Sequence, residues 1–496
     1  MLFKYVLRYK LLLSLSLLWI VVYWYHEKHI PKSLAKQCQW SNWNKHLELK
    51  NHHNVLLVAD PQFVDNHTYP SYNPFFLTIT KHTSDKYLKR SFKYLSKVLK
   101  PDSIIFLGDY HDNGRSSSDV YYEREMDRFH RTFKDYNNIG SKNFIATVPG
   151  NHDIGWKNGI KEHSLERFEQ SFGDPIPYEI FNTLFMPLNT LALSNTENPR
   201  IYEKPHKLLD KIGNLQKDKP RILLTHVPLM RPKAASCGPL READSFPFFA
   251  GYQYQTVLDE DVSQEILTKT RPDFVFSGDD HDYCYVEHPY EYNGNEYIVP
   301  EITVKSISMT MGIQKPAVQL LTIVDENTEG EEFDKSKISF TTEICYSSTP
   351  YSDIIAYAIS AVLSGIIIII YDYRSLFVPM RSTGYSKMNR YHGSGSKDFI
   401  AKLFKSFKTH KNESPYSAVS SNGMESFSID IEDDRDDYSS SLSSYRKRAR
   451  SRANTTYYKS KGSFKSSCIK VLTAILTDFI VVGLIAIFLY FFIIQI

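Results

Sequence analysis

The sequence has no excess of charge of one sign and little cysteine. Its 59 Lys and Arg residues nearly balance its 56 Asp and Glu residues, so the formal net charge is +3 over 496 residues. Proteins that bind the nucleic-acid backbone usually present a basic surface, and this balance therefore argues against a nucleic-acid partner. Of the five cysteines, Cys38, Cys237, Cys284 and Cys345 allow three complete disulfide pairings. A Cys38–Cys345 bond would tie together the two ends of the segment between them.

Long apolar runs are also scarce, and they occur at residues 11–25, 354–371 and 471–494. The last two are long enough for transmembrane helices, for which about 20 apolar residues are typical. The first run is shorter and fits either a signal peptide or an uncleaved anchor. A small-x-small cleavage pattern, Ser33 to Ala35, follows it only after several charged residues. We therefore favour an anchor.

Basic residues beside these runs predict their orientation. Lys4, Arg8 and Lys10 precede the first run, and the segment between the other two is rich in Lys, Arg and Ser. The positive-inside rule places both in the cytosol, and the low-complexity composition predicts disorder in the second. The expected order is a cytosolic N-terminus (1–10), a transmembrane signal anchor (11–25), a lumenal stem (26–50), a lumenal domain (51–350), a transmembrane helix (354–371), a disordered cytosolic segment (372–470) and a transmembrane helix (471–494).

Within the predicted lumenal domain, five apolar stretches each end in polar residues. They are 55–59, 103–107, 143–148, 221–225 and 273–277. Such stretches are typical of buried strands, and ligands bind at the carboxyl ends of strands in open α/β sheets. The residues that follow are Asp60 and Gln62, Asp109 and Asp112, Asn151 to Asp153, His226, and Asp279 to His281. Oxygen and imidazole ligands without thiolate suit Mn²⁺, Mg²⁺, Fe or Zn²⁺.

Further elements are expected around these strands. The apolar spacing of 84–99 predicts an amphipathic helix, and 116–133 predicts a charged helix. Strands are predicted at 191–194, 301–309, 317–324 and 337–344, and the last three would complete a second sheet. The long segment 227–251 contains several Pro and Gly residues. It fits a loop that shapes substrate choice and a plain surface loop equally well.

The motifs, in chain order, resemble the calcineurin-like metallophosphoesterase superfamily. They are Asp60-Pro-Gln62, Gly108-Asp-x-x-Asp-x-Gly-Arg115, Gly150-Asn-His-Asp153, His226 and Gly278-Asp-Asp-His281. Ala-Asp-Pro-Gln, Gly-Asn-His-Asp-Ile-Gly and Ser-Gly-Asp-Asp-His-Asp-Tyr-Cys resemble more closely a membrane branch with yeast and human members. That branch removes ethanolamine phosphate from the glycan of glycosylphosphatidylinositol (GPI) anchors.

The resemblance implies a fold, a metal centre and a substrate. The fold would be an α/β sandwich of two sheets flanked by helices, here joined to transmembrane helices. Two divalent ions, with Mn²⁺ favoured, would be held by Asp60, Asp109, Asn151, His226, Asp279 and His281. Asp109 would bridge them, and His152 would stabilise or protonate the reacting group. The enzyme would act on GPI lipid or GPI-anchored proteins in the endoplasmic reticulum or Golgi membrane, and so aid their export.

Several positions depart from the superfamily pattern or leave alternatives open. Gln62 stands where His is usual, as a weak metal ligand or as a hydrogen-bond donor to a ligand. Either Asp279 or Asp280 replaces the first His of the last motif. Asp153 is expected to orient His152, and Arg115 to contact either a substrate phosphate or a carboxylate.

His111 is not a motif position, and we expect it at the surface or beside a ligand. Asn66-His-Thr68 is a glycosylation acceptor on the lumenal side. Two other functions fit the same residues. One is a lumenal membrane-bound phosphatase for lipid phosphate or pyrophosphate, and the other is a non-catalytic, metal-binding cargo receptor.

Overall fold

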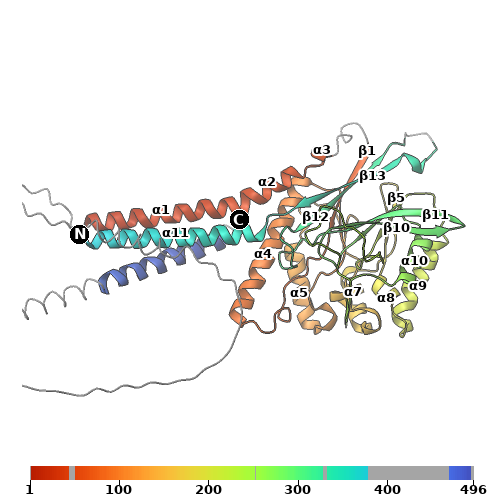
Figure 1. Ribbon diagram of the computed structural model, residues 1–496, viewed down its shortest axis with the longest axis horizontal. Coiled ribbons are helices and arrows are strands. Elements are labelled where there is room, and N and C mark those ends of the chain that lie inside the picture. The colour runs from red at the N-terminus through yellow and green to blue at the C-terminus, as the bar shows by residue number, and fades with distance from the viewer. Residues whose placement is uncertain (1, 44–50, 252, 328–331, 378–468, 493–496) are drawn as a thin grey trace, which may run out of the picture. The chain divides into compact units, whose positions relative to one another are not determined.

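The computed structural model describes residues 2–43, 51–251, 253–327, 332–377 and 469–492 (Figure 1). Its folded domain is built on two mixed β-sheets. The first sheet has the order β13-β12-β1-β2-β3, parallel from β1 to β3 and antiparallel elsewhere. Its strands are β1 (Asn51–Val58), β2 (Ser103–Phe106), β3 (Phe144–Ile145), β12 (Ala317–Asp325) and β13 (Ile338–Tyr346).

The second sheet has the order β10-β11-β9-β6-β5-β4, with parallel pairing from β11 to β5. Its strands are β4 (Tyr178–Ile180), β5 (Thr183–Pro187), β6 (Arg221–Leu224), β9 (Phe274–Ser277), β10 (Cys284–Tyr292) and β11 (Asn295–Thr303). The strands β7 (Ala250–Gly251) and β8 (Tyr254–Gln255) form a small hairpin, and they pair with each other rather than with a strand of either sheet.

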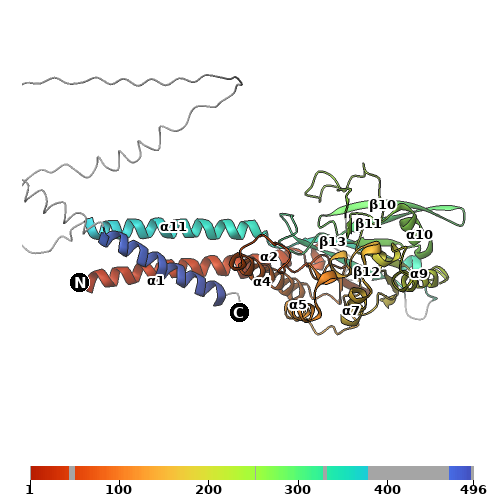
Figure 2. The same cartoon turned by 90° about the horizontal axis from the view of Figure 1, so that it is seen from below.

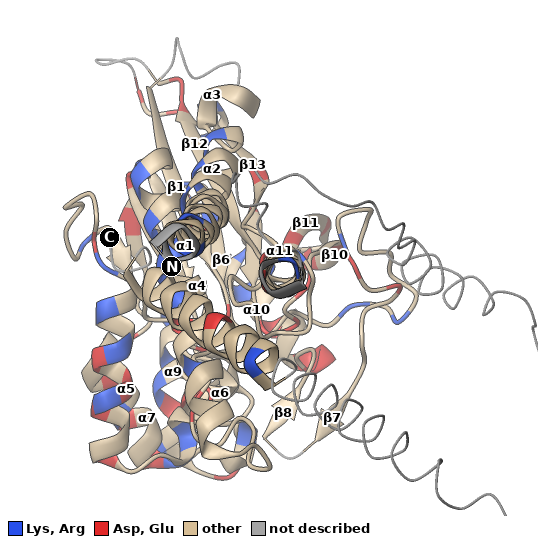
Figure 3. Cartoon of the chain, turned by 90° about the vertical axis from the view of Figure 1, so that its left-hand side faces the viewer, with Lys and Arg blue, Asp and Glu red and all other residues tan. Residues whose placement is uncertain are grey.

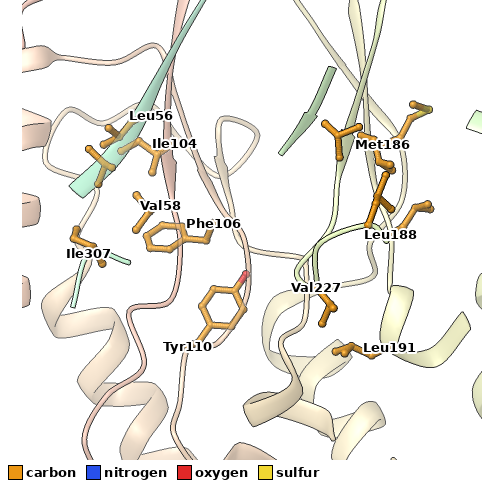
Figure 4. Packing of buried hydrophobic residues seen from close by; sticks show 14 of the residues in the cluster. Leu56, Val58, Ile104, Phe106, Tyr110, Met186, Leu188, Leu191, Val227 and Ile307 are labelled. Carbon is orange, nitrogen blue, oxygen red and sulfur yellow. The ribbon is translucent and has the colours of Figure 1, made fainter. Parts of the chain in front are cut away.

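The two sheets pack face to face, with helices on their outer faces. Val55 and Leu57 of β1 face the second sheet, where they pack in one cluster with residues of β6 and β9. Leu56 and Val58 point the opposite way, into the cluster beneath the helices. Figure 4 shows Val58 lying with Phe106 in that cluster. Both faces of the second half of β1 are thus buried, which explains the apolar run that begins at Val55.

The helices α4 (Pro74–Leu99) and α5 (Asp119–Thr132) belong to the first half of the domain. Those of the second half are α7 (Glu162–Phe172), α8 (Thr190–Leu193), α9 (Pro199–Gly213) and α10 (Glu260–Thr270). Short helices are α3 (Trp40–Trp43), α6 (Asn151–Ile154), and the single turns η2 (Gly114–Ser116), η3 (Lys157–Gly159) and η4 (Lys335–Lys337). The two-sheet α/β fold expected from the sequence is confirmed.

Some expected elements differ from the structure. Residues 191–194 are expected as a strand, but 191–193 belong to α8 and Ser194 is its C-cap; the first turn of α8 is capped by the Asn189 side chain, which accepts from Ala192 N. The strand expected at 301–309 is β11, which ends at Thr303. Strands β12 and β13 are in the first sheet rather than the second, because β12 pairs with β1. An apolar pattern predicts a strand but not its distant partner.

Helix α4 begins ten residues before the position expected from apolar spacing. Asn73 accepts a hydrogen bond from Phe75 N, and Pro74 occupies the first helical position, so the local N-cap signal is strong. The helix ends at Lys100, which adopts a left-handed conformation before Pro101. The early part was missed because its apolar side chains are exposed and belong to no core-facing pattern.

Among the described residues, three helices are long and apolar enough to cross a membrane: Val6–Gln37, Pro350–Arg374 and Ile469–Phe492. The first comprises α1 (Leu2–Trp24), η1 (Tyr25–His29) and α2 (Ile30–Gln37), and the second lies in α11 (Pro350–Phe377) (Figure 2). The segment expected to be disordered lies almost wholly outside the described residues. The chain divides into two compact units, 1–366 with 480–496, and 367–479. Both sheets belong to the first.

Two disulfides join distant parts of the domain. Cys38 after α2 is bonded to Cys345 of β13, and Cys237 is bonded to Cys284 of β10. The first joins residues that are 307 positions apart, so it strongly reduces the conformational entropy of the unfolded chain. Of the three possible pairings, the structure selects the one that joins Cys38 to Cys345.

A buried ion cluster also fastens α4 to the segments beside the apolar helices. Arg90 donates to Glu27 at 2.6 Å and to Asp353 at 2.9 Å, and all three side chains are less than 10% exposed. Replacing Arg90 by Met removes the cation beside the buried Glu27 carboxylate and leaves Asp353 with His26 as its basic partner. We expect Arg90→Met to lower the free energy of unfolding by roughly 3–5 kcal/mol.

Thermal unfolding of the full chain in detergent measures this loss. The matched control is Arg124→Met, because the exposed Arg124 donates to the Val120 carbonyl within its own helix and its loss should cost about 0.5 kcal/mol or less. Equal unfolding midpoints for the two variants would show that the cluster contributes no net stability.

Candidate metal centre

Loops from both sheets bring three of the expected ligands together. Asp60 follows β1, Asp109 follows β2, and His226 follows β6. One ligand atom from each lies within 4.8 Å of the others, and all three residues are buried. His226 Nε2 is 3.3 Å from Asp109 Oδ1, and His226 Nδ1 is 3.7 Å from Asp60 Oδ1. The carboxyl ends of strands from two sheets thus form one polar cluster.

The His226 ring is held in the tautomer that a metal ligand requires. Its Nδ1–H donates to the Leu107 carbonyl at 2.8 Å, so Nε2 carries the lone pair. Nε2 has no hydrogen-bond partner among the described residues. A main-chain carbonyl on the far nitrogen is the usual way to orient a metal-binding imidazole.

Other buried atoms around His226 are also left without partners in the described part of the chain. These are Asp60 Oδ2, Asn151 Oδ1 and Asp279 Oδ2. Unpaired carboxylate and amide oxygens are costly to bury, and a divalent cation would satisfy all of them. Burial raises the pKa of Asp60, and Asp109 and Asp279 raise it further, because three carboxylates crowd one site. The residues therefore fit a metal centre.

The loops at this centre have unusual backbone geometry. Asp60, Asp109, Asp279 and His281 all adopt positive φ values between 47° and 67°. Left-handed conformations of residues other than glycine cost free energy, and they concentrate at functional sites. The loops also approach closely, since a Cβ on Gly150 would lie 2.0 Å from Asp109 Oδ1. Only glycine fits there, which explains the Gly-Asn-His-Asp motif in physical terms.

Asn151 and His152 begin the short helix α6 beside Asp109. His152 N donates to Asp109 Oδ1 at 2.9 Å, so the two loops are directly joined. The His152 ring is partly exposed, and its Nδ1–H donates to the Asp112 carbonyl at 2.6 Å. This bond leaves Nε2 as the nitrogen able to exchange a proton with a bound molecule.

The expectation that Asp153 orients His152 is wrong. The Asp153 carboxylate instead accepts from the main-chain N–H groups of Tyr110, His111 and Gly150, at 2.9–3.1 Å. It fastens the Asp109 loop to the start of α6. The Asp112 main chain holds the imidazole, and no sequence pattern could have identified a carbonyl in that role.

The last motif places its two carboxylates in different surroundings. Asp279 Oδ1 lies 3.5 Å from His226 Nε2, and Asp279 N donates to Asp60 Oδ1 at 3.1 Å. Asp280 instead forms a two-point ion pair with Arg241. Because Arg241 already neutralises Asp280, Asp279 is the better candidate ligand. His281, two residues after Asp279, is half-buried, and burial lowers its pKa.

Residues with open roles are placed as follows. Gln62 Nε2 donates to Asp112 Oδ1 at 2.8 Å, while Gln62 Oε1 is buried without a partner among the described residues. Arg115 donates to the Asn151 carbonyl at 3.0 Å, so it braces α6 and pairs with no carboxylate in the described contacts. His111 is 3% exposed rather than at the surface, and burial lowers its pKa to about 3.

The segment after His226 is largely exposed, but several contacts hold it to the rest of the domain. Ion pairs join Arg231 to Glu301, Arg241 to Asp280, and Glu242 to Lys305, and the Cys237–Cys284 bond adds a covalent link. The hairpin β7–β8 follows, and the Gln253 carbonyl between its strands accepts from Asn151 Nδ2 at 3.1 Å. Sequence reasoning missed Gln253 and Arg241, which carry no motif of their own.

Comparison with known proteins identifies relatives of this domain. A family model described as calcineurin-like phosphoesterase matches residues 53–283. The chain is 40% identical over 350 residues to Cell division control protein 1 of Saccharomyces cerevisiae, covering 69% of this chain and 70% of that protein.

The animal relatives are more distant. Identity to Metallophosphoesterase 1 of Mus musculus is 30% over 244 residues, covering 45% of this chain and 58% of that protein. The homologue from Caenorhabditis elegans is 28% identical over 266 residues, covering 53% and 70%.

Proposed function

Because the chain belongs to the calcineurin-like phosphoesterase family, and is therefore a metal-dependent phosphoesterase, we propose that it removes ethanolamine phosphate from a mannose of the GPI-anchor glycan. The reaction would take place in the lumen of the endoplasmic reticulum or Golgi. The observation that carries this proposal is that the candidate metal site belongs to a chain with helices able to cross a membrane. The domain that holds the site lies in sequence between helices able to cross a membrane, which favours a substrate held in the same membrane.

The ligand set supports a centre for two divalent ions. Asp60, Asp109, Asn151, His226, Asp279 and His281 would hold them, with Asp109 between the two. The set contains more carboxylate and amide oxygen than imidazole, which favours a hard ion such as Mn²⁺. When bound, such ions supply positive charge that stabilises phosphoryl transfer.

The chain's own residues would position the substrate and move the proton. The Asp112 carbonyl accepts from Nδ1–H and fixes the His152 ring, so the ring in its doubly protonated form would give its Nε2 proton to the departing sugar oxygen and become neutral. Asp153 keeps His152 close to Asp109 by joining their loops. The loop after His226, which is held by ion pairs and by the Cys237–Cys284 bond, would limit which phosphodiesters reach the centre. The positive-inside rule supports a lumenal orientation, because Lys4, Arg8 and Lys10 lie at the start of α1 and Arg374 lies in the last turn of α11.

The GPI glycans of cells test the substrate. We expect cells whose own copy is replaced by the His152→Ala chain to retain ethanolamine phosphate on mature anchors. His163→Ala is the matched control, because His163 is exposed and pairs only with Asp119 in the described contacts. The mass profile of released glycans measures the difference and shows which mannose is trimmed.

An unchanged profile in the His152→Ala cells would exclude the GPI glycan as substrate. Activity of the purified chain with Mn²⁺ against lipid phosphates would then favour the second candidate, a membrane-bound lipid phosphatase. Inactivity against all phosphoesters would instead favour a metal-binding receptor.

A further inference from the structure

The first turns of α4 carry a stripe of apolar side chains that the domain does not cover. Phe75, Phe76 and Ile79 are 67%, 61% and 48% exposed. Ile79 lies four residues after Phe75 and three after Phe76, so the three side chains share one side of the helix. We name these three residues the α4 apolar face. A group of large exposed apolar side chains of this kind marks a surface that contacts another phase or molecule.

The same stripe continues along α4 into contacts with the apolar helices. Tyr87, eight residues after Ile79, donates from its hydroxyl to the Ser348 carbonyl at 2.6 Å. Arg90, one turn further, joins Glu27 and Asp353. On this side of α4, the second half of the helix contacts residues next to the apolar helices, whereas the apolar side chains of the first half are exposed.

These contacts place α4 at the ends of all three apolar helices. Glu27 lies three residues beyond the end of α1, and Asp353 lies in the first turn of α11. The ring of His82 packs 5.1 Å from that of Phe491, at the end of the helix Ile469–Phe492. Figures 1 and 3 show α4 crossing the side of the domain from which α1 and α11 project.

With the three apolar helices placed across a bilayer, this arrangement would lay α4 along the bilayer surface. Glu27 and Asp353 are the charged residues that border the apolar runs, so they mark the level at which the helices leave the bilayer. At about 1.5 Å per residue, Phe76 lies roughly 16 Å along α4 from Tyr87. In that placement the α4 apolar face would extend sideways from the three helices at the level of the lipid headgroups.

The charge of α4 fits the same location. The helix contains Lys81, Lys86, Lys89, Arg90, Lys93 and Lys97, against a single acidic residue, Asp85. A basic helix with aromatic and aliphatic side chains on one face is typical of segments that lie in the membrane interface. Basic side chains at this level would meet the phosphates of lipid headgroups.

We propose that the α4 apolar face inserts into the bilayer leaflet next to the domain and holds the metal centre at a set height above it. The occupant of the face is the lipid surface itself. The inference does not depend on the identity of the substrate, because it rests on the contacts of α4 with the three helices.

Photocrosslinking of the full chain in phosphatidylcholine–phosphatidylserine nanodiscs tests the proposal. The crosslinker p-benzoylphenylalanine would replace Phe76 in one preparation and Ile79 in another. Val120 of α5 and Ile176 before β4 are the matched control positions, since they are apolar and 68% and 59% exposed. Hydrolysis of bis(p-nitrophenyl) phosphate verifies that each preparation is folded.

We expect lipid adducts at positions 76 and 79 in at least about fivefold excess over positions 120 and 176, as interfacial insertion requires. Equal yields at all four positions would overturn the proposal. Adducts at 76 and 79 that join two protein chains, without lipid, would also overturn it and identify the face as a contact between copies.

Discussion

Replacing Asp109 by asparagine is expected to abolish phosphodiester hydrolysis and to weaken metal binding. Asp109 is 1% exposed, lies 3.3 Å from His226 Nε2, and accepts from His152 N, so it is at the centre of the cluster. The substitution keeps the side-chain shape but removes a negative charge. Loss of several kcal/mol of transition-state stabilisation corresponds to a decrease in kcat/KM of roughly 10³-fold.

Two measurements on the purified full chain check this prediction. Hydrolysis of bis(p-nitrophenyl) phosphate gives the rate, and elemental analysis after dialysis gives the bound metal. The matched control, Asp174→Asn, removes an exposed carboxylate that pairs with Lys204 and should leave both quantities unchanged. A variant at position 109 that retained full metal content and full rate would exclude Asp109 as a ligand.

Replacing His152 by alanine is expected to separate catalysis from metal binding. His152 is partly exposed, and its imidazole is fixed through Nδ1 by the Asp112 carbonyl. As a proton donor to the leaving oxygen, it should contribute about 10²–10⁴-fold to the rate. Metal content should remain that of the unmodified chain, because a ring held in this way supplies no ligand in the proposed centre.

The dependence on leaving group makes this test specific. A p-nitrophenolate departs readily without a proton, whereas an alkoxide does not. The rate loss in His152→Ala should therefore be much larger for alkyl phosphodiesters than for nitrophenyl ones. A loss of the same size for both would indicate that His152 only stabilises charge or structure. His163→Ala, an exposed histidine, should change neither rate.

The sequence alone predicted the strands that carry the site and the polar residues at their ends. An unbroken apolar run such as 55–59 followed by Asp60 is a local pattern, and burial on both faces of β1 explains it. Asp60, Asp109 and His226 were expected to meet, and they do. The sequence also predicted the three apolar helices and the family. Both predictions rest on runs or short motifs of residues that are adjacent in the chain.

The tertiary structure decided whatever depends on residues far apart in sequence. It placed β12 beside β1, selected the disulfide pairing, and assigned Asp280 to Arg241, which leaves Asp279 at the cluster. It showed that a main-chain carbonyl, that of Asp112, orients the His152 ring. It also showed that α4 begins at Pro74, with its first apolar side chains facing outward beside the ends of the apolar helices. Each outcome depends on packing between distant segments, which apolar periodicity and short motifs do not encode.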